Sequence, residues 1–248
     1  MTDKWLAGQV AVITGGTKGL GWAIAQEYAA QGATVVCASR TGAVDTPVDA
    51  WPGHIVFDSV DVRDPDSVLR LVERTVTAYE RVDILVANAG VNLDSKVERV
   101  TVADWDETLA TNLSGTLHAI QAVVPRMRGQ GGGRIVTVSS SMATRPAIGT
   151  AGYVVSKAGI EALTRVAAIE LGRHGILVNC LAPGILDAGM GRAVLDNDTL
   201  RQAYTKRFGL GRPGRTQEAA QVALWLAGPH SSYVNGAVIE ANGGLSWA

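Results

Sequence analysis

The sequence contains very little cysteine. Cys37 and Cys180 are the only two in 248 residues, too few for the disulfide framework of a small secreted protein. No Cys-x-x-Cys pair or Cys/His cluster occurs, and the four histidines are scattered. Zinc sites need several such ligands at short spacings, so we expect no bound metal.

Also missing are an excess of charge of one sign and a long apolar run. Lys and Arg number 22 and Asp and Glu number 23, which leaves a formal net charge of -1 at pH 7. This balance argues against nucleic acid or an anionic membrane as a partner. No segment approaches the ~18 apolar residues that span a bilayer, and the N-terminus lacks the apolar core of a signal peptide. We therefore expect a soluble, cytoplasmic protein.

Apolar β-branched runs alternate along the chain with longer helical patterns. Apolar residues make up 47% of the sequence, which allows a large buried core. Strands alternating with helices form right-handed crossovers and a parallel sheet covered on both faces. We predict an α/β fold: a single-domain Rossmann fold over residues 1–248, with a doubly wound, mostly parallel, seven-stranded sheet and helices on both faces. The expected strands are 10–14, 34–38, 55–60, 84–87, 134–138, 177–181 and 237–240.

Capping signals locate several helices. Asp64 and Pro65 suit the N-cap and the first position of one helix. Thr101 and Asp104 resemble a capping box before a long helix that we expect to run through Met127. Thr216 is the expected cap of the last helix.

A glycine-rich turn, Thr-Gly-Gly-Thr-Lys-Gly-Leu-Gly at residues 14–21, follows the first predicted strand. Glycines let the backbone approach a ligand, and the N-terminus of the next helix suits a pyrophosphate. The order of strand, glycine turn and helix is typical of dinucleotide binding, although the spacing is G-x-x-x-G-x-G. The alternative is a tight turn without a ligand.

The end of the second strand indicates which dinucleotide binds. NAD sites usually place a carboxylate there for the ribose hydroxyls, but this chain has Ser39 and Arg40. Arg40 and Lys18 could hold a 2′-phosphate, so NADPH/NADP+ is the expected cofactor and NADH is less favoured. The alternative is that both cations belong to a solvated surface.

Tyr153 and Lys157 are four residues apart on a predicted long helix, so their side chains share a face. A phenol with a pKa near 10 is a poor base at neutral pH. An ammonium ~4 Å away would favour the phenolate by about 4 kcal/mol, or about three pK units before desolvation. We therefore expect Tyr153 to act as an acid and base.

Three serines, Ser139, Ser140 and Ser141, follow the fifth predicted strand. Open α/β sheets bind ligands at the carboxyl ends of their strands. A hydroxyl there could donate to a substrate oxygen, or the serines could simply cap a turn. Chemistry alone does not choose among the three.

Together these motifs resemble those of a short-chain dehydrogenase/reductase of the ~250-residue single-domain type. The resemblance extends over essentially the whole chain and rests on the order of the motifs on successive βα units. The motifs are the glycine turn at 14–21, Asp61, Asn88-Ala89-Gly90, Asn112, Ser140, Tyr153, Lys157 and Pro183-Gly184.

The resemblance implies a catalytic role for four residues. Ser140, 13 positions before Tyr153, would polarise the substrate carbonyl, and Tyr153 would transfer the proton. Lys157 would lower the pKa of Tyr153 and bind the nicotinamide ribose. Asn112 would hold a water that relays protons.

The resemblance also implies the cofactor contacts. Asp61 would bind the adenine amino group beside the Val62 backbone, and Ile185 would meet the nicotinamide carboxamide. The expected cofactor-binding residues are Gly15, Thr17, Lys18, Gly19, Leu20, Gly21, Ser39, Arg40, Asp61, Val62, Asn88, Ala89, Gly90, Tyr153, Lys157, Pro183, Gly184 and Ile185.

Two positions depart from the family pattern. Ala87 stands where the family often has a first asparagine, and Ala188 stands where it often has threonine. The change at Ala87 is mild, because Asn88 remains. Since Ala188 carries no hydroxyl, we expect weaker cofactor binding or a substitute contact from Asp187 or the backbone.

The family resemblance further implies that residues 187–213 cover the substrate pocket. It also implies a homotetramer that pairs helices near 104–127 and 152–173. The expected function is NADPH-dependent, reversible reduction of a ketone to a secondary alcohol. One alternative is a 3-oxoacyl-[acyl-carrier-protein] reductase, for which Arg128 and Arg173 are candidate docking residues. An alternative of another class is a catalytically silent nucleotide sensor or scaffold.

Overall fold

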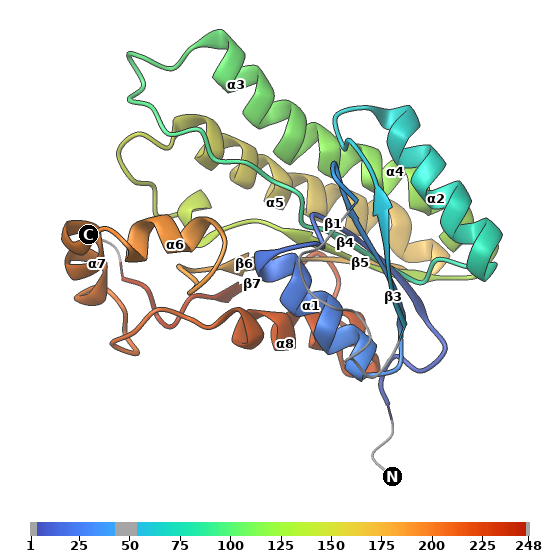
Figure 1. Ribbon diagram of the computed structural model, residues 1–248. Helices are drawn as coiled ribbons and strands as arrows, with labels where there is room; N and C mark the ends of the chain where they lie inside the picture. Colours follow the sequence, from blue (N-terminus) through green and yellow to red (C-terminus); the bar gives the residue numbers. More distant parts are fainter. Residues whose placement is uncertain (1–3, 43–53, 247–248) are drawn as a thin grey trace.

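A seven-stranded sheet forms the centre of the molecule, in the order β3-β2-β1-β4-β5-β6-β7. The computed structural model describes residues 4–42 and 54–246. Every neighbouring pair of strands is parallel, which confirms the predicted doubly wound fold (Figure 1). The strands are β1 (Val10–Thr14), β2 (Thr34–Ser39), β3 (His54–Ser59), β4 (Ile84–Ala87), β5 (Gly133–Val138), β6 (Ile176–Pro183) and β7 (Val238–Ala241).

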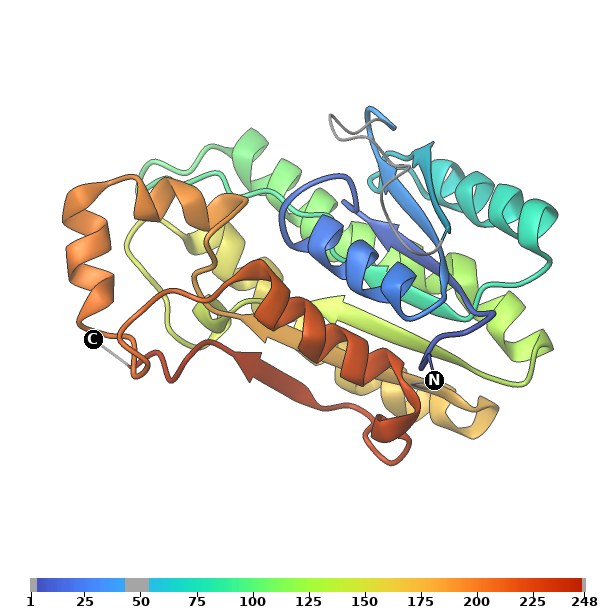
Figure 2. The same ribbon diagram turned by 60° about the horizontal axis from the view of Figure 1, so that its bottom comes forward.

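Helices cover both faces of the sheet, so the central strands are apolar along their whole length. Every residue of β1 and β4 is buried. On one face α1 and α8 lie side by side (Figure 2) and share an apolar cluster with the sheet. On the other face α2, α4 and α5 form a second cluster. The helices are α1 (Gly19–Ala30), α2 (Pro65–Tyr79), α3 (Val102–Leu109), α4 (Gly115–Gly129), α5 (Ala151–Leu171), α6 (Met190–Leu195), α7 (Asp198–Thr205) and α8 (Thr216–Ala227).

The predicted helix caps are confirmed at two of three positions. The Asp64 side chain accepts a hydrogen bond from the backbone of Asp66, and Thr101 accepts one from Asp104. The prediction for Thr216 was wrong by one residue, since Arg215 is the N-cap of α8. Thr216 instead donates its N–H to the Asp187 carboxylate over 3.0 Å.

The long helix expected after Thr101 is interrupted. A π-helical turn, Ala110–Ser114, separates α3 from α4. Two features hold this turn in place. The Asn112 side chain binds the backbone of Val91. Gly115 packs so closely on Val62 that a Cβ at Gly115 would lie only 2.8 Å from a Val62 methyl carbon. Extra residues in a helical turn re-aim a side chain, and such turns are frequent at functional sites.

The strand order reverses between β1 and β4: the connection after β1 leads to β2 on one side, and the connection after β4 leads to β5 on the other. Ligands of open α/β sheets bind outside the carboxyl ends of the strands at such a point. Helices α6 and α7, drawn in orange, extend beyond those strand ends (Figure 2). Within residues 4–42 and 54–246, no helix is both long and apolar enough to cross a membrane.

Candidate active site

The glycine turn after β1 is held closely against the end of β4. Gly15 and Gly19 have φ of 65° and 56°, a region that favours glycine. A Cβ on Gly15 would come within 2.9 Å of Ala89 Cα, and one on Gly21 would clash with the Gly15 carbonyl oxygen. The turn therefore requires glycine at these positions for its own shape, whatever ligand it holds.

Asn88 connects the glycine turn to β4. Its side-chain amide donates to the carbonyl oxygens of Thr14, at 3.1 Å, and Gly15, at 3.0 Å. The Thr14 hydroxyl accepts hydrogen bonds from the backbone N–H groups of Asn88 and Ala89. Asn88 thus positions the turn with its side chain.

Helix α1 begins directly at the turn, and its first N–H groups donate to no capping side chain, because Lys18 at the N-cap makes no such bond. The partial positive charge of an uncapped helix N-terminus suits a pyrophosphate. Leu20 packs on the apolar cluster below, which leaves the backbone of the turn to face a ligand. The turn and helix therefore fit a dinucleotide.

The end of β2 is polar and cationic. Ser39 lies close to Thr41, with 3.4 Å between their hydroxyl oxygens, and accepts a hydrogen bond from Gly42. Arg40 is exposed. The sequence places no carboxylate at these two positions, and the geometry leaves the Arg40 guanidinium accessible to an anion.

Asp61, expected at the adenine, is already engaged by Arg63. The Arg63 guanidinium donates to both carboxylate oxygens, at 2.9 and 2.6 Å, and also to Glu107 at 2.6 Å. These bonds, with a smaller contribution from the nearby Arg40 charge, lower the pKa of Asp61 to about 2. An adenine amino group would have to compete with Arg63, a residue whose role the sequence analysis missed.

Tyr153, Lys157 and Ser140 come together where β5 ends and α5 begins. Their exposed fractions are 9%, 2% and 7%. Ser140 lies near enough to the Tyr153 hydroxyl to lower the pKa of that hydroxyl. The Lys157 ammonium donates to the Val138 carbonyl oxygen at 2.8 Å and lies 5.5 Å from the centre of the Tyr153 ring. The helical spacing thus places the buried side chains of Tyr153 and Lys157 next to each other.

The pKa shift expected for Tyr153 was wrong in sign. Burial raises the pKa of Tyr153, the Ser140 hydrogen bond lowers it in part, and the Asp94 charge raises it further. Burial also lowers the pKa of Lys157 to about 8. Low-dielectric surroundings disfavour the charged form of both groups, so burial, which helical spacing alone does not reveal, sets the direction of both pKa shifts.

The neighbouring serines have different partners. Ser139 donates to the Lys157 carbonyl oxygen at 3.1 Å and to the Glu161 carboxylate at 3.0 Å. Ser140 faces Tyr153, and its oxygen also accepts the Met142 N–H at 3.2 Å. Sequence chemistry left the choice among the serines open, and the structure brings Ser140 to the Tyr153 hydroxyl.

Asn112 uses its side chain inside the protein. Its oxygen accepts the Val91 N–H at 2.8 Å, and its amide donates to the Val91 carbonyl and the Ser156 hydroxyl, both at 2.9 Å. Ser156 in turn donates to the Tyr153 carbonyl at 2.7 Å. The π-helical turn is therefore tied to α5 beside Tyr153.

The segment that follows β6 packs closely against the segment that follows β7. A Cβ on Gly184 would come within 2.8 Å of Asn242 Cα. The Ile185 carbonyl accepts the Gly214 N–H at 3.0 Å. Because the Asp187 carboxylate accepts from Thr216, it is already committed at the start of α8.

Two further segments border the site. Ser95 donates its N–H to the Gly149 carbonyl at 2.8 Å, which joins the loop after β4 to the loop before α5. Asp94 acts electrostatically on Tyr153 from this wall. The segment 187–213 approaches from the other side, since a Cβ on Gly19 would lie 3.4 Å from Gly189 Cα.

The parallel sheet, the glycine turn and the buried Tyr153, Lys157 and Ser140 define an oxidoreductase of the short-chain dehydrogenase/reductase family, to which the chain belongs. A family model described as enoyl-(acyl carrier protein) reductase matches residues 15–246. A solved short-chain type dehydrogenase/reductase from Mycobacterium ulcerans superposes with a TM-score of 0.90 at 26% identity, over 97% of this chain and 90% of that one.

Two curated relatives are similar along nearly their whole length. The 3-oxoacyl-[acyl-carrier-protein] reductase FabG of Thermotoga maritima is 37% identical over 244 residues, 97% of this chain and 98% of the relative. The (2S)-[(R)-hydroxy(phenyl)methyl]succinyl-CoA dehydrogenase subunit BbsD of Thauera aromatica is 38% identical over 245 residues, 96% of each chain.

Proposed function

We propose that this protein is an NADPH-dependent reductase that converts a ketone to a secondary alcohol and works reversibly. The observation that carries the proposal is the buried meeting of the Tyr153 hydroxyl with Ser140 and Lys157, next to a glycine turn shaped for a dinucleotide. The family membership supports the same reaction class.

Each side chain then has a defined task. The nicotinamide, when bound, supplies the hydride. Ser140 donates a hydrogen bond to the carbonyl oxygen, and Tyr153 gives its proton to the same oxygen as negative charge develops there. A raised pKa keeps Tyr153 protonated, which suits a proton donor at neutral pH. Lys157, with a pKa of about 8, can then return a proton to Tyr153 from solvent.

The test is Tyr153→Phe, which removes one hydroxyl. We expect NADPH binding by calorimetry to persist and turnover of a test ketone to fall by at least 10²-fold, the loss typical for a general acid. Unchanged turnover would remove Tyr153 from the reaction. If wild type binds NADPH but neither reduces any ketone nor oxidises any alcohol in a broad panel, a catalytically silent sensor or scaffold becomes the preferred function.

The preference for NADPH rests on Arg40 and Lys18. Both are exposed, and the sequence has no acidic residue at positions 39–40. A guanidinium binds a phosphate through two parallel hydrogen bonds. Replacing Arg40 by Ser should raise the KM for NADPH about tenfold and leave the KM for NADH nearly unchanged. Equal effects on both would contradict the assignment.

A second candidate is reduction of a 3-oxoacyl group on acyl carrier protein. It is supported by the FabG relatives. A basic cluster also supports it: the pKa of His174 is lowered first by desolvation and then by the charges of Arg128 and Arg173, which therefore lie close to it. Charge reversal of both arginines should raise the KM for a carrier-bound substrate and spare a small ketone. No difference between the two substrates would leave the general ketone reductase.

We also propose a cytoplasmic homotetramer in which residues 187–213 cover the substrate. Apolar side chains on α4 and α5 support the assembly, because Val166 and Ile169 are 51% and 82% exposed and Leu117 is 38% exposed. Such patches mark protein contacts. Sedimentation of Ile169→Glu should show smaller species than wild type, and an unchanged tetramer would exclude this face.

A further inference from the structure

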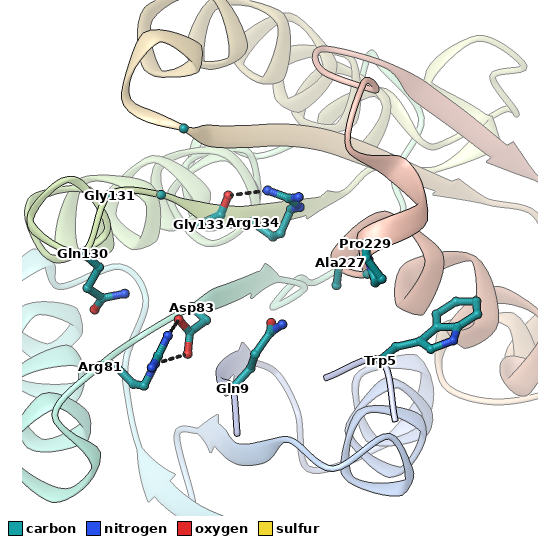
Figure 3. Close-up of a pocket in the computed structure, with 13 residues that line it drawn as sticks. Trp5, Gln9, Arg81, Asp83, Gln130, Gly131, Gly133, Arg134, Ala227 and Pro229 are labelled. Carbon is teal, nitrogen blue, oxygen red and sulfur yellow. Dashed lines mark hydrogen bonds and ion pairs between the residues drawn. The ribbon is translucent and has the colours of Figure 1, made fainter. Parts of the chain in front are cut away.

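A hollow of about 410 Å³ lies at the amino ends of the strands, whereas Tyr153 lies at their carboxyl ends. It is formed where β1, β4, β5 and β6 begin, together with the end of α8, and Figure 3 shows its lining side chains. We call it the amino-end hollow. Its volume is within the range of small-molecule sites, ~300–1,000 Å³. Nothing in the proposed reaction uses it.

Arg134 is the charged side chain of this hollow that lacks a charged partner in the described part of the chain. Its backbone is fixed in β5, paired with Ile84 on one side and Leu177 on the other. Burial lowers the pKa of its guanidinium. In the described part of the chain, the guanidinium makes a long hydrogen bond, 3.4 Å, to the adjacent Gly133 carbonyl (Figure 3), and its Nε is buried without a partner.

Two other polar side chains of the hollow, Asp83 and Gln130, already have partners. Asp83 accepts two hydrogen bonds from Arg81, both at 2.7 Å, and a third from the Val10 N–H at 2.8 Å. Gln130 binds the Val82 backbone through both its oxygen and its nitrogen. Within residues 4–42 and 54–246 no carboxylate forms an ion pair with Arg134. The lining therefore carries one uncompensated positive charge.

The rest of the molecule shows what an arginine in this position can bind. Arg81 presents its Nε and Nη2 side by side to the two oxygens of Asp83. Arg74 does the same to Asp58, at 2.8 and 2.9 Å. This edge of the guanidinium matches a carboxylate in both spacing and charge. Leaving it desolvated and unpaired is costly, so the vacant edge of Arg134 favours an oxyanion.

The remaining walls are apolar. Trp5, Ala227 and Pro229 face the same hollow (Figure 3). Trp5 is 36% exposed and is held edge-on by His230, with 4.5 Å between ring centres. A ligand anchored at Arg134 would therefore have an aromatic and aliphatic surface beside it.

We propose that the amino-end hollow binds a small organic acid, whose carboxylate pairs with the guanidinium of Arg134 and whose apolar body packs on Trp5 and Pro229. This would be a second ligand site, separate from the catalytic one, and it does not depend on the proposed reaction.

The experiment titrates wild type with benzoate, acetate and inorganic phosphate at constant ionic strength, and reads the melting temperature and the quenching of tryptophan fluorescence. At ten times its Kd, benzoate should raise Tm by about 3–6 °C, and acetate should bind more weakly because it lacks the ring. Stabilisation by phosphate alone, or by none of the three, would overturn the proposal.

Variants then locate the site. Arg134→Gln should lose the benzoate shift, and Arg134→Lys, which keeps the charge but not the paired donors, should weaken it at least tenfold. Arg99→Met removes an exposed arginine and should bind as wild type does. Equal binding by Arg134→Lys and wild type would contradict the paired geometry. If Arg134→Gln does not fold, the comparison of Arg134→Lys with Arg99→Met still decides.

The chain's own Asp3 is a rival occupant, although it lies outside the described residues. In Asp3→Asn we expect benzoate to bind as it does to wild type. Binding that emerges only after Asp3 is replaced would mean that the protein neutralises Arg134 itself, and would refute an external ligand.

Discussion

Replacing Lys157 by Met should stabilise the protein at neutral pH while abolishing its turnover. Lys157 is 2% exposed, and burial lowers its pKa from 10.5 to about 8. A lowered pKa means that the folded state resists the proton which the unfolded chain accepts. Methionine has a similar length and carries no charge, so it fills the same space without that penalty.

The magnitude and its pH dependence follow from linkage. Lowering the pKa of Lys157 from 10.5 to about 8 corresponds to about 3 kcal/mol of stability that wild type lacks below pH 8. As pH rises from about 8 towards 10.5, the unfolded lysine also loses its proton, and wild type regains this stability. The advantage of Lys157→Met should therefore shrink by about 2 kcal/mol between pH 7 and pH 9.5. Losing the hydrogen bond to Val138 subtracts about 1 kcal/mol at both pH values.

The assay is urea unfolding of both proteins at equal protomer concentration, at pH 7 and pH 9.5. Tyr153 also titrates in the alkaline range, but it is present in both proteins, so its effect largely cancels in the difference. Lys206→Met, which replaces an exposed lysine, serves as the control and should show no pH-dependent difference. If Lys157→Met and wild type keep a constant difference in stability across this range, Lys157 does not carry the burial cost inferred from the structure.

Other changes test neighbouring parts of the site. Asn88→Ala leaves the Thr14 and Gly15 carbonyls without their side-chain donor, so we expect a loss of about 1–3 kcal/mol in urea unfolding and weaker NADPH binding by calorimetry. Ser140→Ala should lower kcat on a ketone by at least tenfold with little loss of Tm, whereas Ser139→Ala should mainly lower Tm; the reverse pattern would mean the two serines are misassigned. In the proposed reaction, alcohol oxidation needs deprotonated Tyr153, whose pKa is raised by burial. The kcat/KM for an alcohol with NADP+ should then still be increasing above pH 9, and a plateau below pH 8 would contradict that direction.

Much of the fold could be predicted because its signals are local. The apolar runs at β1 and β4 match the predicted strands residue for residue, since strands buried on both faces need continuous apolar sequence. The Asp64 cap was identifiable because it acts within one helical turn. The break between α3 and α4 was not, because it depends on contacts of Asn112 and Gly115 with distant strand ends.

The candidate site divides in the same way. Sequence alone determined that a glycine turn follows the first strand and that Tyr153 and Lys157 share a helical face, because both depend on spacing within one element. Tertiary structure decided that Ser140 lies next to Tyr153, that Arg63 donates hydrogen bonds to the Asp61 carboxylate, and that burial raises the pKa of Tyr153. These outcomes depend on which residues, distant in the chain, meet and lose water together. The unpaired Arg134 also emerges only when four strand ends and a helix end enclose it.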